Sequence, residues 1–215
     1  MLKKFSFTLL IISFVLISCA KKSDNSSSST TTTTYPTSTS GVTANGSMTI
    51  GDYSVSGTYD TACQTSLVAA YLAASLAPTD MQSYKFRYVV TGSDSVSDEL
   101  FFYSDTACST LVFSLKSADT NVAVGVASGS DYKVTYKSSS HKELVLSDAA
   151  ETWREATYSN LNLSVDFTQG CVRESSGSGS EYKNLWNVTS TTLKVGDDSK
   201  DDYPSSVDNT DYTKQ

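Results

Sequence analysis

Apolar and polar residues alternate with a period of two along most of the chain beyond residue 45. Successive side chains of a β-strand point to opposite faces, so this alternation predicts strands with one buried face. The clearest example has an apolar face made of Tyr84, Phe86, Tyr88 and Val90. The pattern predicts about nine or ten strands, near residues 48–59, 84–90, 99–103, 111–116, 122–127, 132–137, 143–146, 160–168, 185–188 and 192–195.

The connections between these segments are short and rich in turn-forming residues. Residues 127–131, with the sequence Ala-Ser-Gly-Ser-Asp, are an example. Short connections favour antiparallel neighbours, and closing such a sheet on itself removes its exposed edges. We therefore expect an all-β fold, an antiparallel up-and-down barrel of about 8–10 strands with one or two short helices.

Two segments have a helical pattern instead. The first begins with Thr65 or Ser66 as its cap and is stopped by Pro78, and its apolar side is expected to pack on or plug one end of the barrel. The second is expected to start at Asp148, where Glu151 completes the spacing of a capping box.

The N-terminal segment has the features of a secretory signal. Lys3 and Lys4 precede an apolar run over residues 5–17, and the small Ser18 stands before Cys19. Such a run fits the apolar region of a signal peptide and is too short to cross about 30 Å of hydrocarbon. We expect residues 1–18 to be removed as a signal peptide, which leaves Cys19 as the first residue of the mature chain.

Residues 16–19, Leu-Ile-Ser-Cys, resemble the lipobox of bacterial lipoproteins. The resemblance implies that Cys19 carries three acyl chains, and two or more chains are enough for stable anchoring. Ala20 follows the cysteine where aspartate would imply retention in the inner membrane. The resemblance therefore implies attachment to the outer membrane, and leaves open whether the protein faces the periplasm or the cell surface.

A polar tract separates this cysteine from the strand-forming region. Residues 26–34 are all serine or threonine, and such a tract cannot bury apolar surface. We expect residues 19–44 to form a disordered tether, residues 45–196 to form the barrel domain, and residues 197–215 to form an acidic C-terminal segment. About 150 residues are enough to bury an independent core.

The charge of the chain excludes some partners. Sixteen Lys and Arg residues stand against twenty-three Asp and Glu, a net charge of −7, and removal of Lys3 and Lys4 with the signal leaves fourteen against twenty-three, or −9. An acidic domain is unsuited to nucleic acid and to electrostatic attachment to anionic lipids. Contact with the membrane should therefore come through the lipid on Cys19.

Three further cysteines lie in the strand-forming region. Cys63 and Cys108 each end the sequence Asp-Thr-Ala-Cys after a tyrosine, and similar turns suggest that these two thiols pair in an oxidising compartment. The bridge would close a loop of about 45 residues, worth about 4 kcal/mol, and would leave Cys171 unpaired. A bridge between Cys63 and Cys171 is the alternative, since connectivity does not follow from sequence.

Several short segments around these cysteines carry a second resemblance. They are residues 55–59 followed by Cys63, residues 101–105 followed by Cys108, the Gly57-x-Tyr59 pair, residues 193–197, and residues 203–208 with residues 212–214. They resemble the lipocalin-like extracellular domains of a Wnt-signalling inhibitor and of small bacterial lipoproteins. The resemblance implies a barrel whose interior, as in those relatives, holds lipids or similar ligands.

Catalytic chemistry is not indicated. His141 is the only histidine and stands in the polar run of residues 138–142, where a surface loop is expected. No serine triad can be built around it from sequence, and the absence of a Cys-x-x-Cys pair disfavours a metal site. Residues 175–180 have the composition of a hairpin loop. We expect no enzymatic activity, no cofactor and no metal.

Two functions remain, and they differ in whether the barrel is hollow. A hollow barrel would bind a small apolar molecule, and the candidate contacts are Tyr84, Phe86, Tyr88, Phe102, Phe113 and Tyr136. A solid barrel, filled by the same side chains, would be a non-catalytic interaction or structural module of the envelope, with a protein partner that the sequence does not identify.

Overall fold

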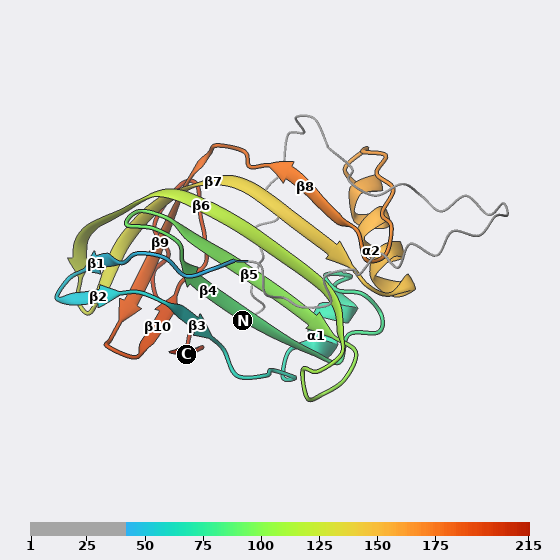
Figure 1. The fold of residues 1–215 in the computed structure, drawn as a ribbon, viewed down its shortest axis with the longest axis horizontal. Coiled ribbons are helices and arrows are strands. Elements are labelled where there is room, and N and C mark those ends of the chain that lie inside the picture. The colour runs from blue at the N-terminus through green and yellow to red at the C-terminus, as the bar shows by residue number, and fades with distance from the viewer. Residues whose placement is uncertain (1–41) are drawn as a thin grey trace, which may run out of the picture.

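The computed structural model describes residues 42–215 (Figure 1). The predicted signal peptide, Cys19 and all but the end of the tether lie outside these residues. The described part forms eleven strands and two helices. In chain order they are β1 (Met48–Ile50), β2 (Tyr53–Val55), β3 (Thr58–Asp60), α1 (Val68–Ala73), β4 (Ser83–Val90), β5 (Val96–Tyr103), β6 (Leu111–Ser128), β7 (Asp131–Val145), α2 (Asp148–Ser159), β8 (Val172–Ser176), β9 (Glu181–Val188), β10 (Thr192–Val195) and β11 (Tyr212–Lys214).

Eight of the strands close into an antiparallel barrel. The order β6-β5-β4-β3-β11-β10-β9-β7 returns to β6, because β6 and β7 also pair with each other. Strands that follow one another along the chain are neighbours around most of the ring, which is the up-and-down arrangement. The predicted all-β barrel is confirmed. Strands β1 and β2 form a separate hairpin.

The barrel interior is packed with aromatic side chains from alternate strand positions. On β4 the predicted inward face is confirmed, since Tyr84, Phe86, Tyr88 and Val90 all belong to the buried core. The rings of Tyr84 and Phe86 meet edge to face with centroids 5.5 Å apart, and such pairs contribute about 0.5–1.5 kcal/mol beyond their burial.

Strands β6 and β7 are much longer than the sequence suggests. The segments predicted at 111–116 and 122–127 form one strand, and so do those at 132–137 and 143–146. The intervening polar residues were expected in loops. The structure corrects this because several of them face a polar interior rather than solvent, as described below.

Strand β7 is bordered on one side by two strands in succession. β9 pairs with residues 132–137 and β8 with residues 140–144. At the junction the Gly177 N–H donates to the Ser139 carbonyl at 2.8 Å, and a Cβ on Gly177 would overlap the Ser138 carbonyl. Only glycine fits this close approach of the two backbones. The hairpin loop predicted at 175–180 is shorter than expected, because residues 175 and 176 belong to β8.

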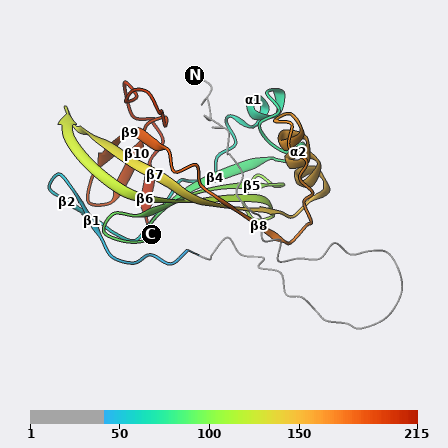
Figure 2. The ribbon, with the colours of Figure 1, turned by 90° about the horizontal axis from the view of Figure 1, so that it is seen from above.

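Both helices cover the same end of the barrel (Figures 1 and 2). α1 has Leu67 at its N-cap with no side-chain hydrogen bond, so the expected cap at Thr65 or Ser66 is wrong. The Trp153 Nε1–H of α2 donates to the Ser75 carbonyl at 3.0 Å, which ties α2 to the chain after α1.

The start of α2 at Asp148 agrees with the prediction, but the capping residue does not. Ser147 is the N-cap, and its hydroxyl accepts from the Ala150 N–H at 3.1 Å. Asp148 and Glu151 lie in the first turn, where negative side chains favour the helix dipole. Neither helix of residues 42–215 is long and apolar enough to span a membrane.

The segment predicted as a strand at 160–168 is irregular chain. Its backbone groups bond to α2 instead of a neighbouring strand. The Leu163 N–H donates to the Tyr158 carbonyl at 3.0 Å, and the Phe167 N–H donates to Glu155 Oε1 at 3.0 Å. The alternation of apolar residues in this segment reflects its packing along α2 and not hydrogen bonding to a neighbouring β-strand.

The predicted acidic C-terminal segment contains a strand of the barrel. β11 lies between β3 and β10, with Thr213 paired to Asp60 and Tyr212 to Leu193. The boundary predicted at residue 196 is therefore too early, because the ring does not close without β11. A strand of three residues with one buried apolar side chain is too short to show a period of two.

The predicted pairing of Cys63 with Cys108 is confirmed over the alternative with Cys171. Their sulfur atoms are 2.11 Å apart, and the bridge joins the chain after β3 to the connection between β5 and β6. Cys171 is 8 % exposed, and no cysteine among the described residues is free, so the expected unpaired thiol at this position is not found.

Candidate ligand-binding site

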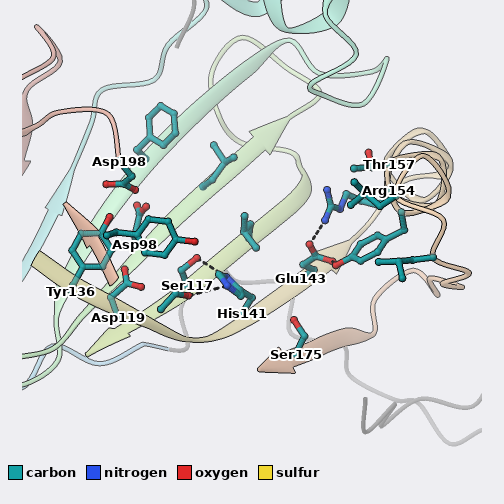
Figure 3. A pocket seen from close by; sticks show the side chains of 18 residues that line it. Asp98, Ser117, Asp119, Tyr136, His141, Glu143, Arg154, Thr157, Ser175 and Asp198 are labelled. Carbon is teal, nitrogen blue, oxygen red and sulfur yellow. Dashed lines mark hydrogen bonds and ion pairs between the residues drawn. The ribbon is translucent and has the colours of Figure 1, made fainter. Parts of the chain in front are cut away.

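A cavity of about 200 Å³ lies inside the barrel, between α2 and the chain that follows β10 (Figure 3). Its apolar walls come from Phe86, Leu100, Leu115, Leu161 and Leu163. Its polar lining comprises Asp98, Ser117, Asp119, Tyr136, Ser138, His141, Glu143, Arg154, Thr157, Tyr158, Ser175, Tyr182 and Asp198. The barrel is thus partly hollow, and the hollow part is lined by both apolar and polar side chains.

A β-bulge in β7 brings the polar residues inward. Asp119 of β6 pairs with Ser138 and Ala118 pairs with Ser140, which leaves Ser139 as an extra residue. A bulge re-aims the side chains that follow it. Inward positions therefore change from even to odd numbers, and His141 and Glu143 join Ser138 in the lining.

One end of the cavity is acidic, and we call Asp98, Asp119, Asp198 and Tyr136 the acidic end. Figure 3 shows these side chains grouped together, away from α2. Asp98 comes from β5 and Asp119 from β6. Burial of Asp119, together with the nearby charges of Asp98 and Asp198, raises the pKa of its carboxyl to about 8.

Asn184 of β9 holds the segment that carries Asp198. Its side chain is fully buried. Its amide donates to the Gly196 carbonyl at 3.0 Å and also to Asp198 Oδ1, while its own oxygen accepts from the Gly196 N–H at 2.9 Å. A buried side chain with both polar atoms satisfied fixes its neighbours firmly, so Asp198 has a defined position over the cavity.

His141 lies in the middle of the cavity wall and not in a surface loop, which corrects the prediction. Ser117 Oγ is 2.9 Å from its Nδ1, and Ser138 Oγ is 3.0 Å from its Nε2. Burial lowers the pKa of the imidazole, opposed by the charge of Glu143. Hydrolytic triads place a carboxylate on one ring nitrogen. Among the described residues, a serine hydroxyl lies beside each nitrogen of His141 in place of a carboxylate.

The end of the cavity near α2 is closed by a buried ionic network. Arg154 donates to Glu143 Oε1, and Tyr158 donates to Glu143 Oε2 at 3.2 Å. Arg173 Nη1 lies 3.6 Å from Glu143 Oε2 and donates to the Tyr158 hydroxyl at 2.8 Å. Glu143 thus has three partners, and the network fixes α2 against β7.

The six ligand contacts expected from sequence divide into two groups. Phe86 and Tyr136 line the cavity. The other four, Tyr84, Tyr88, Phe102 and Phe113, are buried in the packed core beside it. The remaining predicted site residue, Cys19, lies outside the described residues, so its lipidation stays a prediction.

Sequence reasoning missed the charged lining. Asp98 stands two residues from Val96 and two from Leu100, both of which point into the barrel. This spacing was an available signal that an aspartate occupies an inward position. No comparable signal marks Asp198, because its place depends on Asn184.

Within residues 42–215 no group of three or more His, Cys, Asp or Glu side chains is placed to hold a metal ion. The carboxylates of the acidic end therefore do not form a coordination site, although they lie near one another. What the arrangement offers is a small volume with apolar walls, hydroxyl groups and negative charge.

No family model matches the chain, and no curated protein matches its sequence.

Proposed function

We propose that the protein is a lipid-anchored binding protein of the bacterial outer membrane whose barrel holds one small, largely apolar ligand. The observation that carries the proposal is the cavity of about 200 Å³, which is lined by both apolar and polar side chains. Concave sites that combine apolar surface with placed polar groups are typical of small-molecule binding. The role is binding without catalysis, in keeping with the surroundings of His141.

The size of the cavity limits the ligand. Sites for drug-sized molecules measure about 300–1,000 Å³, whereas an apolar cavity of about 150 Å³ is enough for benzene. A cavity of about 200 Å³ therefore suits a molecule slightly larger than one aromatic ring, or the end of a longer chain.

The anchoring part of the proposal is supported by the N-terminal sequence. Residues 16–19 and the preceding apolar run favour lipidation of Cys19. About twenty residues of flexible tether would hold the barrel on the order of 25 Å from the bilayer. A domain held at that distance meets solutes near the membrane surface without being inserted into it.

A second function, that of an interaction module, is favoured by one observation. The β6–β7 hairpin projects beyond the barrel (Figures 1 and 2), and near its tip Val126 is 83 % exposed. An exposed apolar residue on a projecting hairpin suits contact with an envelope protein. Binding in the cavity and contact at the tip involve different residues.

Native mass spectrometry of the protein purified from its own envelope tests the binding function. Leu163→Trp fills the cavity from an irregular segment, so the barrel strands are left intact. Val126→Trp makes the same change at the exposed tip and is the control. We expect a bound small molecule on the wild type and on Val126→Trp, and its loss from Leu163→Trp. Consistent absence of any adduct from the wild type would refute ligand binding.

A further inference from the structure

Acidic side chains outnumber basic ones among the described residues that line the cavity. Four of them are carboxylates, Asp98, Asp119, Glu143 and Asp198, and one is a guanidinium, Arg154. Arg154 is paired with Glu143 at the end near α2. Of the three carboxylates at the acidic end, only that of Asp119 belongs to a buried residue.

Asp119 gives the clearest indication that something positive belongs there. Its side chain lines the cavity, and the residue is only 4 % exposed. No hydrogen bond or ion pair to its carboxylate comes from any residue in the described part of the chain. An ionised carboxylate buried without a partner is costly, so the group either keeps its proton or is paired with a cation.

The other titratable groups around Asp119 do not supply that compensation. Asp98 faces it from β5, Tyr136 from β7 and Asp198 from the chain after β10, while His141 lines the same cavity from β7. Burial lowers the pKa of His141, so its ring is neutral at physiological pH. The raised pKa of Asp119, about 8, is the expected response of a carboxyl group that is buried and held among like charges.

The nature of the cation follows from the rest of the lining. The carboxylates are not placed to coordinate a metal ion. Leu100 and Leu115 line the cavity from the same strands as Asp98 and Asp119. The ring of Tyr136 also lines this end of the cavity, and aromatic faces attract organic cations. A protonated amine donates hydrogen bonds to carboxylates and hydroxyls, while its hydrocarbon part occupies apolar volume.

Building on the proposed binding function, we propose that the ligand is a small organic amine, bound in its protonated form with its nitrogen at the acidic end and its apolar part against Phe86, Leu100 and Leu115. Asp119 accepts a hydrogen bond from the ammonium group, and Asp98 and Asp198 supply further negative charge.

Three probes of nearly equal size separate charge from shape: 2-phenylethylamine, 2-phenylethanol and phenylacetate. Their binding to the full-length mature protein is measured by isothermal titration calorimetry at pH 7.5. We expect the amine to bind at least about tenfold more tightly than the alcohol, which corresponds to about 1.4 kcal/mol, and phenylacetate to bind least. Added Ca²⁺ should not displace the amine.

Matched variants test whether the carboxylates of the acidic end cause the preference for the amine. Asp119→Asn should weaken amine binding about tenfold and leave alcohol binding unchanged, consistent with loss of one charge-assisted hydrogen bond. Asp98→Asn provides a second test from a different strand. Asp52→Asn, the same change at an exposed turn outside the cavity, should alter neither.

The outcomes distinguish this inference from the function on which it rests. Equal affinity for amine and alcohol, or amine binding that Asp119→Asn does not weaken, would overturn the cationic ligand while leaving a binding cavity. One-for-one displacement of the amine by Ca²⁺ would assign the acidic end to a metal and also overturn it. If no probe binds and native mass spectrometry finds no adduct, the binding function itself fails.

Discussion

Replacing Asp119 by asparagine should stabilise the ligand-free protein, and the gain should grow with pH. In the unfolded chain this carboxyl ionises near pH 4, whereas in the folded protein its pKa is about 8. Between these values the unfolded chain has lost a proton that the folded protein keeps. The contribution of Asp119 to the free energy of unfolding is therefore largest below about pH 4 and falls as the pH rises toward 8.

The size of the effect follows from the same two values. The pKa rises from 3.8 to about 8, over about four pH units, and each unit is worth about 1.4 kcal/mol. Wild-type protein should thus lose about 5 kcal/mol between pH 4 and pH 8 through this residue. An asparagine side chain has nearly the same shape as aspartate and no charge, so the variant avoids this loss.

Urea unfolding of ligand-free protein at pH 4, 6 and 8 measures the difference, followed by the fluorescence of Trp153 and Trp186, the two tryptophans of the chain. The wild type and Asp119→Asn should agree at pH 4 and diverge by about 5 kcal/mol at pH 8. Asp52→Asn should follow the wild type throughout. Stability curves for the wild type and Asp119→Asn that stay parallel with pH would refute the account of Asp119 as a buried, uncompensated acid.

Three further predictions concern the scaffold around the cavity. Gly177→Ala should lower the free energy of unfolding by about 1–3 kcal/mol, because the new methyl group overlaps the β7 backbone; a thermal melt equal to that of the wild type would contradict the close approach. Arg154→Met should cost about 3–5 kcal/mol by leaving Glu143 without its main partner. The double variant with Glu143→Gln should recover much of that loss in urea unfolding, and additive losses would argue against coupling. Replacing Cys63 and Cys108 together by serine should cost about 4 kcal/mol under non-reducing conditions, and an unchanged urea midpoint would show that the bridge is dispensable.

The fold could be predicted from the sequence where the barrel interior is apolar. The alternation on β4 identified its inward face correctly, because aromatic residues at every second position leave one strand orientation that buries them. The same reasoning divided β6 and β7 into shorter strands. Their central residues are polar on both faces, and a rule that equates inward with apolar fails where a strand lines a polar cavity.

The candidate site was harder to predict than the fold for a related reason. The inward positions of β7 change phase at the extra residue Ser139, and no residue type in the run of serines marks this change. Asp198 reaches the cavity only because Asn184 binds the chain beside it. Such contacts arise from tertiary packing, and a single sequence carries little local signal for them.

The pairing of strand β3 affects the order in which the barrel can fold. Its partner β11 is paired through Thr213 and Asp60, so it emerges from the ribosome about 150 residues later. Contacts this distant in sequence slow folding, and until they form, β3 offers unpaired backbone groups to other chains. A polypeptide with this delay benefits from assistance while it folds, since premature association with a second copy competes with completion of its own ring.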